Sequence, residues 1–199
     1  MPEFPCRKCD LALAIVLTLA SAAQAGDMSI ASDMDMLRAD FFKPEISANE
    51  ALISQSGNSN IARITERVDA GVYGHYAEIN QNGQSNQASV EQTGSSNRAR
   101  IDQIGSFNSV RATQGGSGNS LDVMQSGLGN SIDLAQTGDA NLFYASQTGD
   151  NNHIVATQNG VPGTLVEGGN NNSIIVNLSG TAPSVSISIT GNGLSVKVN

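Results

Sequence analysis

The chain has little of the material from which a globular enzyme builds its core. Its 199 residues include no Trp, three Tyr and five Phe, and charged residues make up only 14% of them. A stacked array of small repeats can fold with this composition, because each unit packs only against its neighbours. The composition therefore favours a repeat architecture over a globular catalytic domain.

Cysteine is nearly absent, and proline is missing from the longest part of the chain. Both cysteines, Cys6 and Cys9, lie in the first 25 residues, and no proline occurs between Glu45 and Val161. Because proline lacks the N–H that a sheet needs, its absence leaves this stretch free to form strands. If the first 25 residues are removed, the mature chain has no disulfide or thiol chemistry.

Residues 1–25 have the pattern of a secretory signal peptide. The basic pair Arg7-Lys8 precedes the short apolar run Leu11–Ala23, and a small-x-small site follows, so we expect cleavage between Ala25 and Gly26. The apolar run is too short to span a membrane, and a retained anchor is the alternative interpretation. Residues 26–48 carry no repeat and are interpreted as a flexible leader that serves export or recognition.

Cleavage at this site leaves the net charge of −8 unchanged, because the segment carries two acidic and two basic residues. An acidic chain is a poor candidate for binding nucleic acid or an anionic membrane. The charge is expected to keep a secreted chain soluble.

From residue 49 onward the chain follows an eleven-residue period, which is typical of repeat proteins. Glutamine opens each unit, glycine follows two positions later, asparagine follows five positions later, and two small apolar residues precede the next glutamine. The glutamines are Gln55, Gln81, Gln92, Gln103, Gln114, Gln125, Gln136, Gln147 and Gln158. The glycines are Gly57, Gly83, Gly94, Gly105, Gly116, Gly127, Gly138, Gly149 and Gly160. The asparagines are Asn60, Asn86, Asn97, Asn108, Asn119, Asn130, Asn141 and Asn152.

Within a unit, inward and outward residues alternate as in a half-buried β-strand. In the unit 97–103, Asn, Ala, Ile and Gln share one face, and Arg, Arg and Asp share the other. The preceding cluster Thr93–Ser96 is expected to form a turn, because its glycine permits positive φ. The loops are too short for the helix that usually joins parallel strands. We therefore predict an all-β, amyloid-like β-solenoid (β-helix) of about seven coils, each made of two strands from two eleven-residue units.

The glutamine and asparagine side chains are expected to form structural amide ladders inside this solenoid. A buried amide without a partner costs roughly a few kcal/mol. It avoids that cost by donating to the identical amide one coil away, about 4.8 Å along the axis. A slip of one residue would bury Arg100, so the pattern specifies the register. Neither end has a clear cap, which suits the chain to extension by copies or relatives.

Some units depart from the period. In the irregular stretch 66–81, Glu66 stands in a glutamine position and Arg67–Gly74 is interpreted as a longer loop. The unit 158–167 is two residues short and ends in Glu167, and the divergent repeats of 159–199 have apolar residues in the ladder positions. Over residues 49–199 we count fourteen strand candidates.

The order Gln-x-Gly-x-x-Asn-x-apolar-x-apolar-x-Gln resembles the curlin repeat of curli fibre subunits, the secreted functional amyloid of Gram-negative biofilms. The resemblance covers residues 49–160 well and 161–199 loosely. Residues 94–103, and the arginines at positions 63, 98, 100 and 111, are similar to the minor subunit, which nucleates the fibre. Minor subunits tend to have a basic, amide-bearing last repeat. Val185–Asn199 departs from this, since its one basic residue is Lys197, and the major subunit stays the alternative.

The resemblance implies a non-enzymatic structural subunit of an extracellular fibre, a fimbrium or pilus at the bacterial cell surface that supports adhesion and biofilm formation. It also implies passage through a dedicated outer-membrane secretion pore with accessory factors, and polymerisation with other curlin subunits. No cofactor, metal or nucleic acid is expected as a partner.

No catalytic, cofactor-binding or metal-ligating set stands out in the sequence. His75 and His153 are far apart and are expected to be solvated. Clusters such as Asp150–Asn152 are explained by turn chemistry, because calcium-binding repeats have a nine-residue period. A soluble secreted β-solenoid adhesin is the second hypothesis, since the outward residues vary. A polysaccharide hydrolase is the third, but it would need paired carboxylates that do not stand out.

Overall fold

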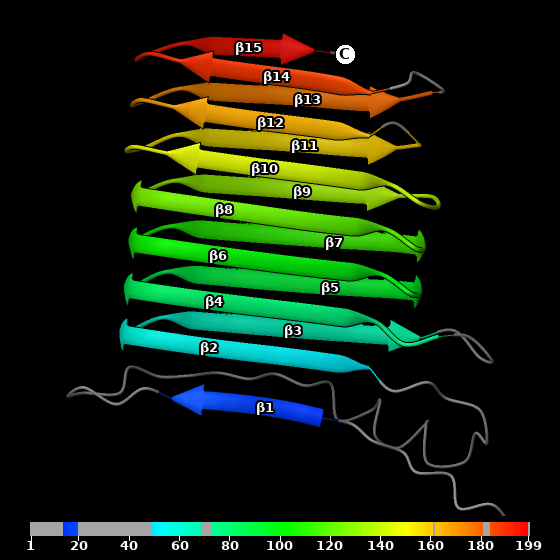
Figure 1. Cartoon of the computed structure of the whole chain (residues 1–199). Helices are drawn as coiled ribbons and strands as arrows, with labels where there is room; N and C mark the ends of the chain where they lie inside the picture. Colours follow the sequence, from blue (N-terminus) through cyan, green and yellow to red (C-terminus); the bar gives the residue numbers. More distant parts are fainter. Residues whose placement is uncertain (1–13, 20–48, 69–72, 161, 181–183, 199) are drawn as a thin grey trace, which may run out of the picture.

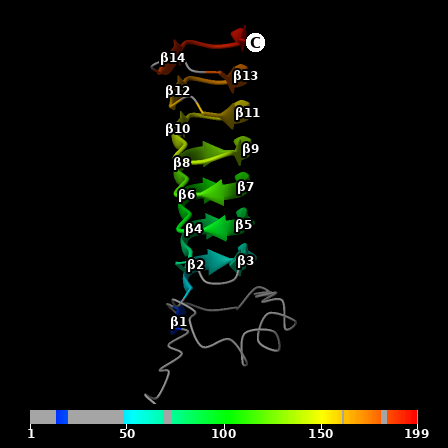
Figure 2. The same cartoon turned by 90° about the vertical axis from the view of Figure 1, so that its right-hand side faces the viewer.

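Two facing stacks of parallel strands make up the computed structural model of the chain. It describes residues 14–19, 49–68, 73–160, 162–180 and 184–198. Figure 1 shows the strands rising one above another, and Figure 2 shows the two stacks side by side. The strands are β1 (Ala14–Leu19), β2 (Glu50–Asn58), β3 (Ile61–Val68), β4 (Tyr76–Gln84), β5 (Gln87–Ser95), β6 (Arg98–Ser106), β7 (Ser109–Ser117), β8 (Ser120–Leu128), β9 (Ser131–Thr137), β10 (Leu142–Thr148), β11 (His153–Asn159), β12 (Gly163–Gly168), β13 (Ser173–Ser179), β14 (Val185–Thr190) and β15 (Ser195–Val198).

From β2 onward, successive strands alternate between the two sheets. The even sheet, to which β1 also belongs, has the order β1-β2-β4-β6-β8-β10-β12-β14, and the odd sheet has the order β3-β5-β7-β9-β11-β13-β15. In the middle of the chain, paired residues are 22 positions apart, as in Ala99↔Leu121. One coil therefore consists of one even and one odd strand, and the predicted β-solenoid with fourteen strands after residue 49 is confirmed for the described residues.

Alternation of burial along each strand places the apolar residues between the sheets. In β6, Ala99 and Ile101 are fully buried, whereas Arg98 and Arg100 are exposed. The facing predicted for the unit 97–103 is therefore correct. Each buried Val, Leu or Ile side chain contributes about 1.5–3 kcal/mol relative to an exposed one. The buried apolar residues form one cluster that runs from Ile53 to Ile189.

One large side chain interrupts this layer of small residues. Phe143 in β10 is fully buried and pairs in register with Gly163 of β12. A Cβ atom at Gly163 would lie 3.0 Å from the Phe143 ring and 2.5 Å from Leu178 Cδ1. The glycine thus makes the space that the phenylalanine fills, in the coil that is two residues short.

Coil length departs from 22 residues at the two places where the sequence is irregular. Gln55 pairs with Gln81, 26 positions away, and Gln147 pairs with Glu167, 20 positions away. The loop was expected at 67–74, but its predicted start is too early, because Arg67 and Val68 continue β3 and pair with β5. A strand does not need to end where the glycine is missing while its neighbour still offers backbone partners. Residues 69–72 lie outside the described part.

The first and last strands leave the ends of the stack unequal. β1 pairs in parallel with β2, from Ala14↔Glu50 to Leu19↔Gln55. The rest of the expected signal segment 1–25, and all of 26–48, lie outside the described residues. Within the described part of the chain, β3, β14 and β15 have no strand partner on their outer edges, and no helix is long and apolar enough to cross a membrane.

Candidate functional site: the amide ladders and their ends

The glutamine side chains form one ladder along each sheet. Gln103 Nε2 donates to Gln125 Oε1 at 2.9 Å and to the backbone oxygen of Gln87 at 3.0 Å. Because a backbone oxygen can only accept, this second bond fixes which end of the amide is the nitrogen. The same amide-to-amide bond, of 2.5–2.8 Å, joins the pairs Gln55–Gln81, Gln81–Gln103, Gln92–Gln114, Gln114–Gln136, Gln125–Gln147 and Gln136–Gln158. Each of these amides therefore donates toward the C-terminal end of the stack.

The asparagines stand at the corners, where the chain passes from one sheet to the other. Asn108 Nδ2 donates to the backbone oxygens of Ile104, at 3.2 Å, and Gly127, at 3.0 Å. Its Oδ1 accepts from the backbone N–H of Asn130 at 3.1 Å. The equivalent three bonds are made by Asn60, Asn97, Asn119, Asn130, Asn152 and Asn172. Each asparagine thus ties its own corner to the next coil.

The repeat glycines lie where the backbones of neighbouring coils come closest. Gly105 has φ +113°, and a Cβ atom there would lie 2.1 Å from the backbone oxygen of Gly127. The turn expected at Thr93–Ser96 is wrong for its first three residues, because β5 continues to Ser95. The reason is that the neighbouring coil bends in the same way, so the parallel pairing continues through Gly94↔Gly116.

The sequence suggested a solvated His75, and this is wrong. The side chain is buried, with 2% of its surface exposed. It occupies an asparagine position: its Nδ1 accepts from the backbone N–H of Asn97 at 3.2 Å, and its Nε2 lies 3.0 Å from the backbone oxygen of Arg67. These contacts require the neutral tautomer with hydrogen on Nε2. The signal was available, since His75 precedes Gln81 by six residues, as Asn86 precedes Gln92. His153, in contrast, is exposed.

Two carboxyl groups occupy glutamine positions, and both are buried. Glu66 is 3% exposed, and burial, with a smaller contribution from Glu50, raises its pKa to about 8. Glu167 is 1% exposed, and burial raises its pKa against the opposing effect of the hydrogen bond from Gln147. Gln147 Nε2 donates to Glu167 Oε2 at 2.9 Å. After Gln158 in the odd sheet and Glu167 in the even sheet, the ladder positions hold Leu178 and Ile189, so both ladders end in apolar residues.

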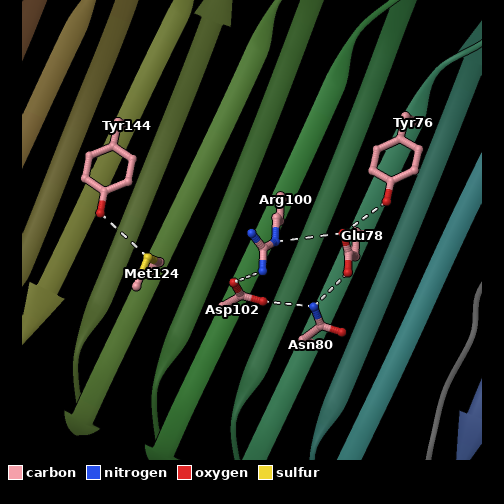
Figure 3. A network of polar contacts seen from close by, with 7 residues as sticks. All are labelled: Tyr76, Glu78, Asn80, Arg100, Asp102, Met124 and Tyr144. Carbon is pink, nitrogen blue, oxygen red and sulfur yellow. Dashed lines mark hydrogen bonds and ion pairs between the residues drawn. The ribbon is translucent and has the colours of Figure 1, made fainter.

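The outer face of the even sheet carries an ordered polar network (Figure 3). Asn80 Nδ2 donates to Glu78 and to Asp102, both at 2.9 Å, and Tyr76 donates to Glu78 at 3.0 Å. Arg100 lies 2.7 Å from Asp102 and 3.8 Å from Glu78. The hydrogen bond from Asn80 is the main cause of the lowered pKa of Glu78. These contacts link β4 and β6 on the side away from the core.

Farther along the same face the residues become apolar. The Tyr144 hydroxyl contacts Met124 Sδ at 3.6 Å, and Met124 and Leu142 are largely exposed. In the ranges that the structure describes, no group of three or more His, Cys, Asp or Glu side chains is placed to hold a metal. The outer face thus offers contact surface, whereas the repeated chemistry lies inside.

A parallel β-solenoid with amides and glycines stacked from coil to coil defines the class: a cross-β repeat protein. Within that class, the sequence model of the curlin associated repeat matches residues 76–105, 96–127 and 129–160. Over these ranges the chain is similar to the curlin associated repeat, and this similarity and the β-solenoid fold together support a curlin-type structural subunit. Comparison of the chain with curated proteins and with solved structures gives no match.

Proposed function

We propose that the chain is the minor subunit of an extracellular curli-type amyloid fibre and nucleates polymerisation of the major subunit at the cell surface. The observation that carries this proposal is the in-register amide ladder, which is satisfied only by stacking. The outer edges of β14 and β15 have no partner among the described strands, and an edge of this kind accepts a further strand. A fibre built in this way supports adhesion and biofilm formation.

The unequal ends of the ladders favour the minor over the major subunit. In a head-to-tail pair of copies, Ile189 of one copy would meet Gln55 of the next in the even sheet. The amide of Gln55 would then face an apolar side chain and lose a ladder bond, which costs about 1–3 kcal/mol. A chain whose two ends do not match is better suited to start a fibre of another subunit than to form a long polymer of itself.

The proposal includes the route to the surface. Cleavage between Ala25 and Gly26 removes the signal peptide, and residues 26–48 address the mature chain to the outer-membrane secretion pore and its accessory factors. The partners outside the cell are other curlin subunits. Mass spectrometry of the secreted chain tests the cleavage, since a retained segment would add its full mass.

Fibre formation is the first test. Purified mature chain should form fibres with diffraction spacings of about 4.7 Å along the axis and about 10 Å between sheets. A chain that stays monomeric for days at high concentration would contradict the fibre role. It would favour a soluble β-solenoid adhesin instead, for which the ordered outer network of Glu78, Asn80, Arg100 and Asp102 is the specific support. A saturable ligand would then be expected.

A seeding assay separates the two subunit roles. Substoichiometric amounts of the mature chain should shorten the lag of a separate curlin that lacks the irregular units. Ile101→Asp, which buries a charge, should abolish this effect, and Asp102→Asn on the outer face should preserve it. If the chain leaves the lag unchanged and is itself seeded by the other curlin, it is the major subunit and not the nucleator.

A further inference from the structure

We infer that Glu66 is a proton-binding site of the folded solenoid: it stands in the ladder as a neutral carboxylic acid whose O–H donates to Gln92 Oε1. This assignment goes beyond the fibre role and does not depend on it, because it concerns how the first and second coils of one chain are joined. Its basis is the direction of the ladder and two oxygen atoms that lack a partner.

The first step is the direction of the amides in the odd sheet. Gln92 Nε2 donates to Gln114 Oε1 at 2.7 Å and to the backbone oxygen of Tyr76 at 3.2 Å. Turning the amide over would lose both bonds, so Gln92 Oε1 is fixed toward the preceding coil. An oxygen in that position needs a donor from the residue one rung earlier. In every regular coil, that donor is the Nε2 of a glutamine.

The second step is the residue that occupies the earlier rung. Glu66 pairs in register with Gln92, at the place that a glutamine holds elsewhere. Glu66 Oε1 and Gln92 Oε1 are both buried, and neither has a hydrogen-bond partner among the described residues. An ionised carboxylate can only accept, so with Glu66 ionised neither oxygen would gain a hydrogen from this pair. One proton on Glu66 provides the missing donor and satisfies both atoms.

The neutral acid also reproduces the shape of the residue that it replaces. A protonated carboxyl group has one O–H donor and one C=O acceptor, as the glutamine amide has N–H donors and one acceptor. Burial and the charge of Glu50 act in the same direction, because they raise the pKa of Glu66 to about 8 from its ordinary value of 4.5. Glu66 therefore imitates glutamine while it holds its proton, and loses that property when ionised.

Among the described residues, the surrounding charges do not supply another partner. Residues that titrate or carry charge on the adjoining strands have outward side chains: Glu50 on β2, Arg63 and Arg67 on β3, Tyr76 and Glu78 on β4, and Glu91 on β5. His75 is buried before β4, and its two ring nitrogens meet Asn97 and Arg67 backbone atoms. Of these groups, Glu50 is the one whose charge acts on Glu66, and it opposes ionisation.

Glu167 provides an internal contrast at the other end of the even sheet. It receives a hydrogen bond from Gln147 at 2.9 Å, and the next rung is Ile189. Glu167 Oε1 is also buried without a hydrogen-bond partner among the described residues, but the apolar next position offers it no acceptor, so a proton there would complete no ladder bond. Glu66 needs a proton to complete its ladder, whereas Glu167 does not, although both are buried glutamates in glutamine positions.

The sign of the pH dependence follows from the raised pKa. The stability that Glu66 contributes is fully present below its unfolded pKa of 4.5 and is lost as the pH rises through about 8. Between these values the folded chain binds one proton more than the unfolded chain. The equilibrium constant for folding should therefore fall about tenfold per pH unit within this window. Glu66→Gln should remove this slope, because the amide is a permanent donor.

The test compares the mature chain with Glu66→Gln and Glu167→Gln. Infrared spectra at about pH 6, where exposed carboxyls are ionised, should show a carboxylic-acid carbonyl band to which Glu66 contributes. Glu66→Gln should remove this contribution, whereas Glu167→Gln should leave it in place. Denaturant midpoints at about pH 6 and about pH 9 should converge in Glu66→Gln, with the larger gain over wild type at the higher pH. An unchanged infrared band, or a Glu66→Gln chain that is equally destabilised at both values, would overturn the proposal.

Both readouts can be taken on monomer or on fibre, so they are independent of nucleation. If Glu66→Gln loses its pH slope while the chain fails to seed another curlin, the proton site stands and the fibre role does not. If the chain seeds normally but Glu66→Gln behaves like wild type, the reverse holds.

Discussion

Removing one corner asparagine should destabilise the solenoid more than its size suggests. Asn108→Ala deletes three hydrogen bonds: a buried one from the N–H of Asn130, and two partly buried ones to the backbone oxygens of Ile104 and Gly127. The N–H of Asn130 is left without an acceptor, and an orphaned buried donor costs about 1–3 kcal/mol. The two backbone oxygens each lose one donor, and a small void remains. We expect a total loss of roughly 2–5 kcal/mol in the free energy of unfolding.

The matched control is Asn82→Ala, because Asn82 is exposed on β4. That change should stay within about 0.5 kcal/mol of wild type. Urea unfolding followed by circular dichroism measures both. Asn108→Asp keeps the acceptor oxygen but turns a donor into a charge that faces two backbone oxygens, so it should be at least as destabilising as alanine. Equal midpoints for the Asn108 and Asn82 alanine variants would refute the idea that corner amides hold the coils together.

Three other predictions follow from facing and backbone geometry. Ile101→Asp should lengthen the assembly lag, measured by thioflavin fluorescence, far more than Asp102→Asn, which loses one partly exposed ion pair of about 0–1 kcal/mol. Comparable lags would contradict the inward facing of Ile101 and the outward facing of Asp102. Gly105→Ala should block stacking by collision with the next coil, whereas Gly118→Ala, which meets open space at φ +68°, should cost only about 1–2 kcal/mol in thermal unfolding. Phe107→Asn should stabilise the chain by about 1 kcal/mol, because an exposed phenylalanine stands there at φ +57°; a lower midpoint would show that the ring makes a needed contact.

The regular middle of the chain was predictable because its signature residues have one use each. Glycine at the approach of two backbones, asparagine at a corner and glutamine between sheets each satisfy a backbone or amide requirement that no other side chain meets as well. Repetition of the set fixes strand number, facing and register together. The facing of Ile101 and Asp102 could be derived from alternation alone.

The irregular positions are harder to predict, because their role depends on neighbours in space. His75 follows an insertion, so counting forward from Glu66 misses its place in the asparagine column, and only counting back from Gln81 reveals it. The demand on Glu66 depends on which end of the Gln92 amide faces it, and that is set by the backbone oxygen of Tyr76. The end of β3 shifted for a related reason, since pairing with β5 outweighs the missing glycine.

The glycines of one corner stack in a column in which no residue has a side chain. Gly57, Gly83, Gly105, Gly127, Gly149, Gly169 and Gly191 follow one another along one corner, and in the first six a Cβ atom would lie 1.8–2.1 Å from the backbone oxygen of the next. Any chain that continues the stack at this corner must therefore also lack a side chain at that position. The column works as a filter on partners: it excludes a foreign strand by a single methyl group, before any favourable contact is made.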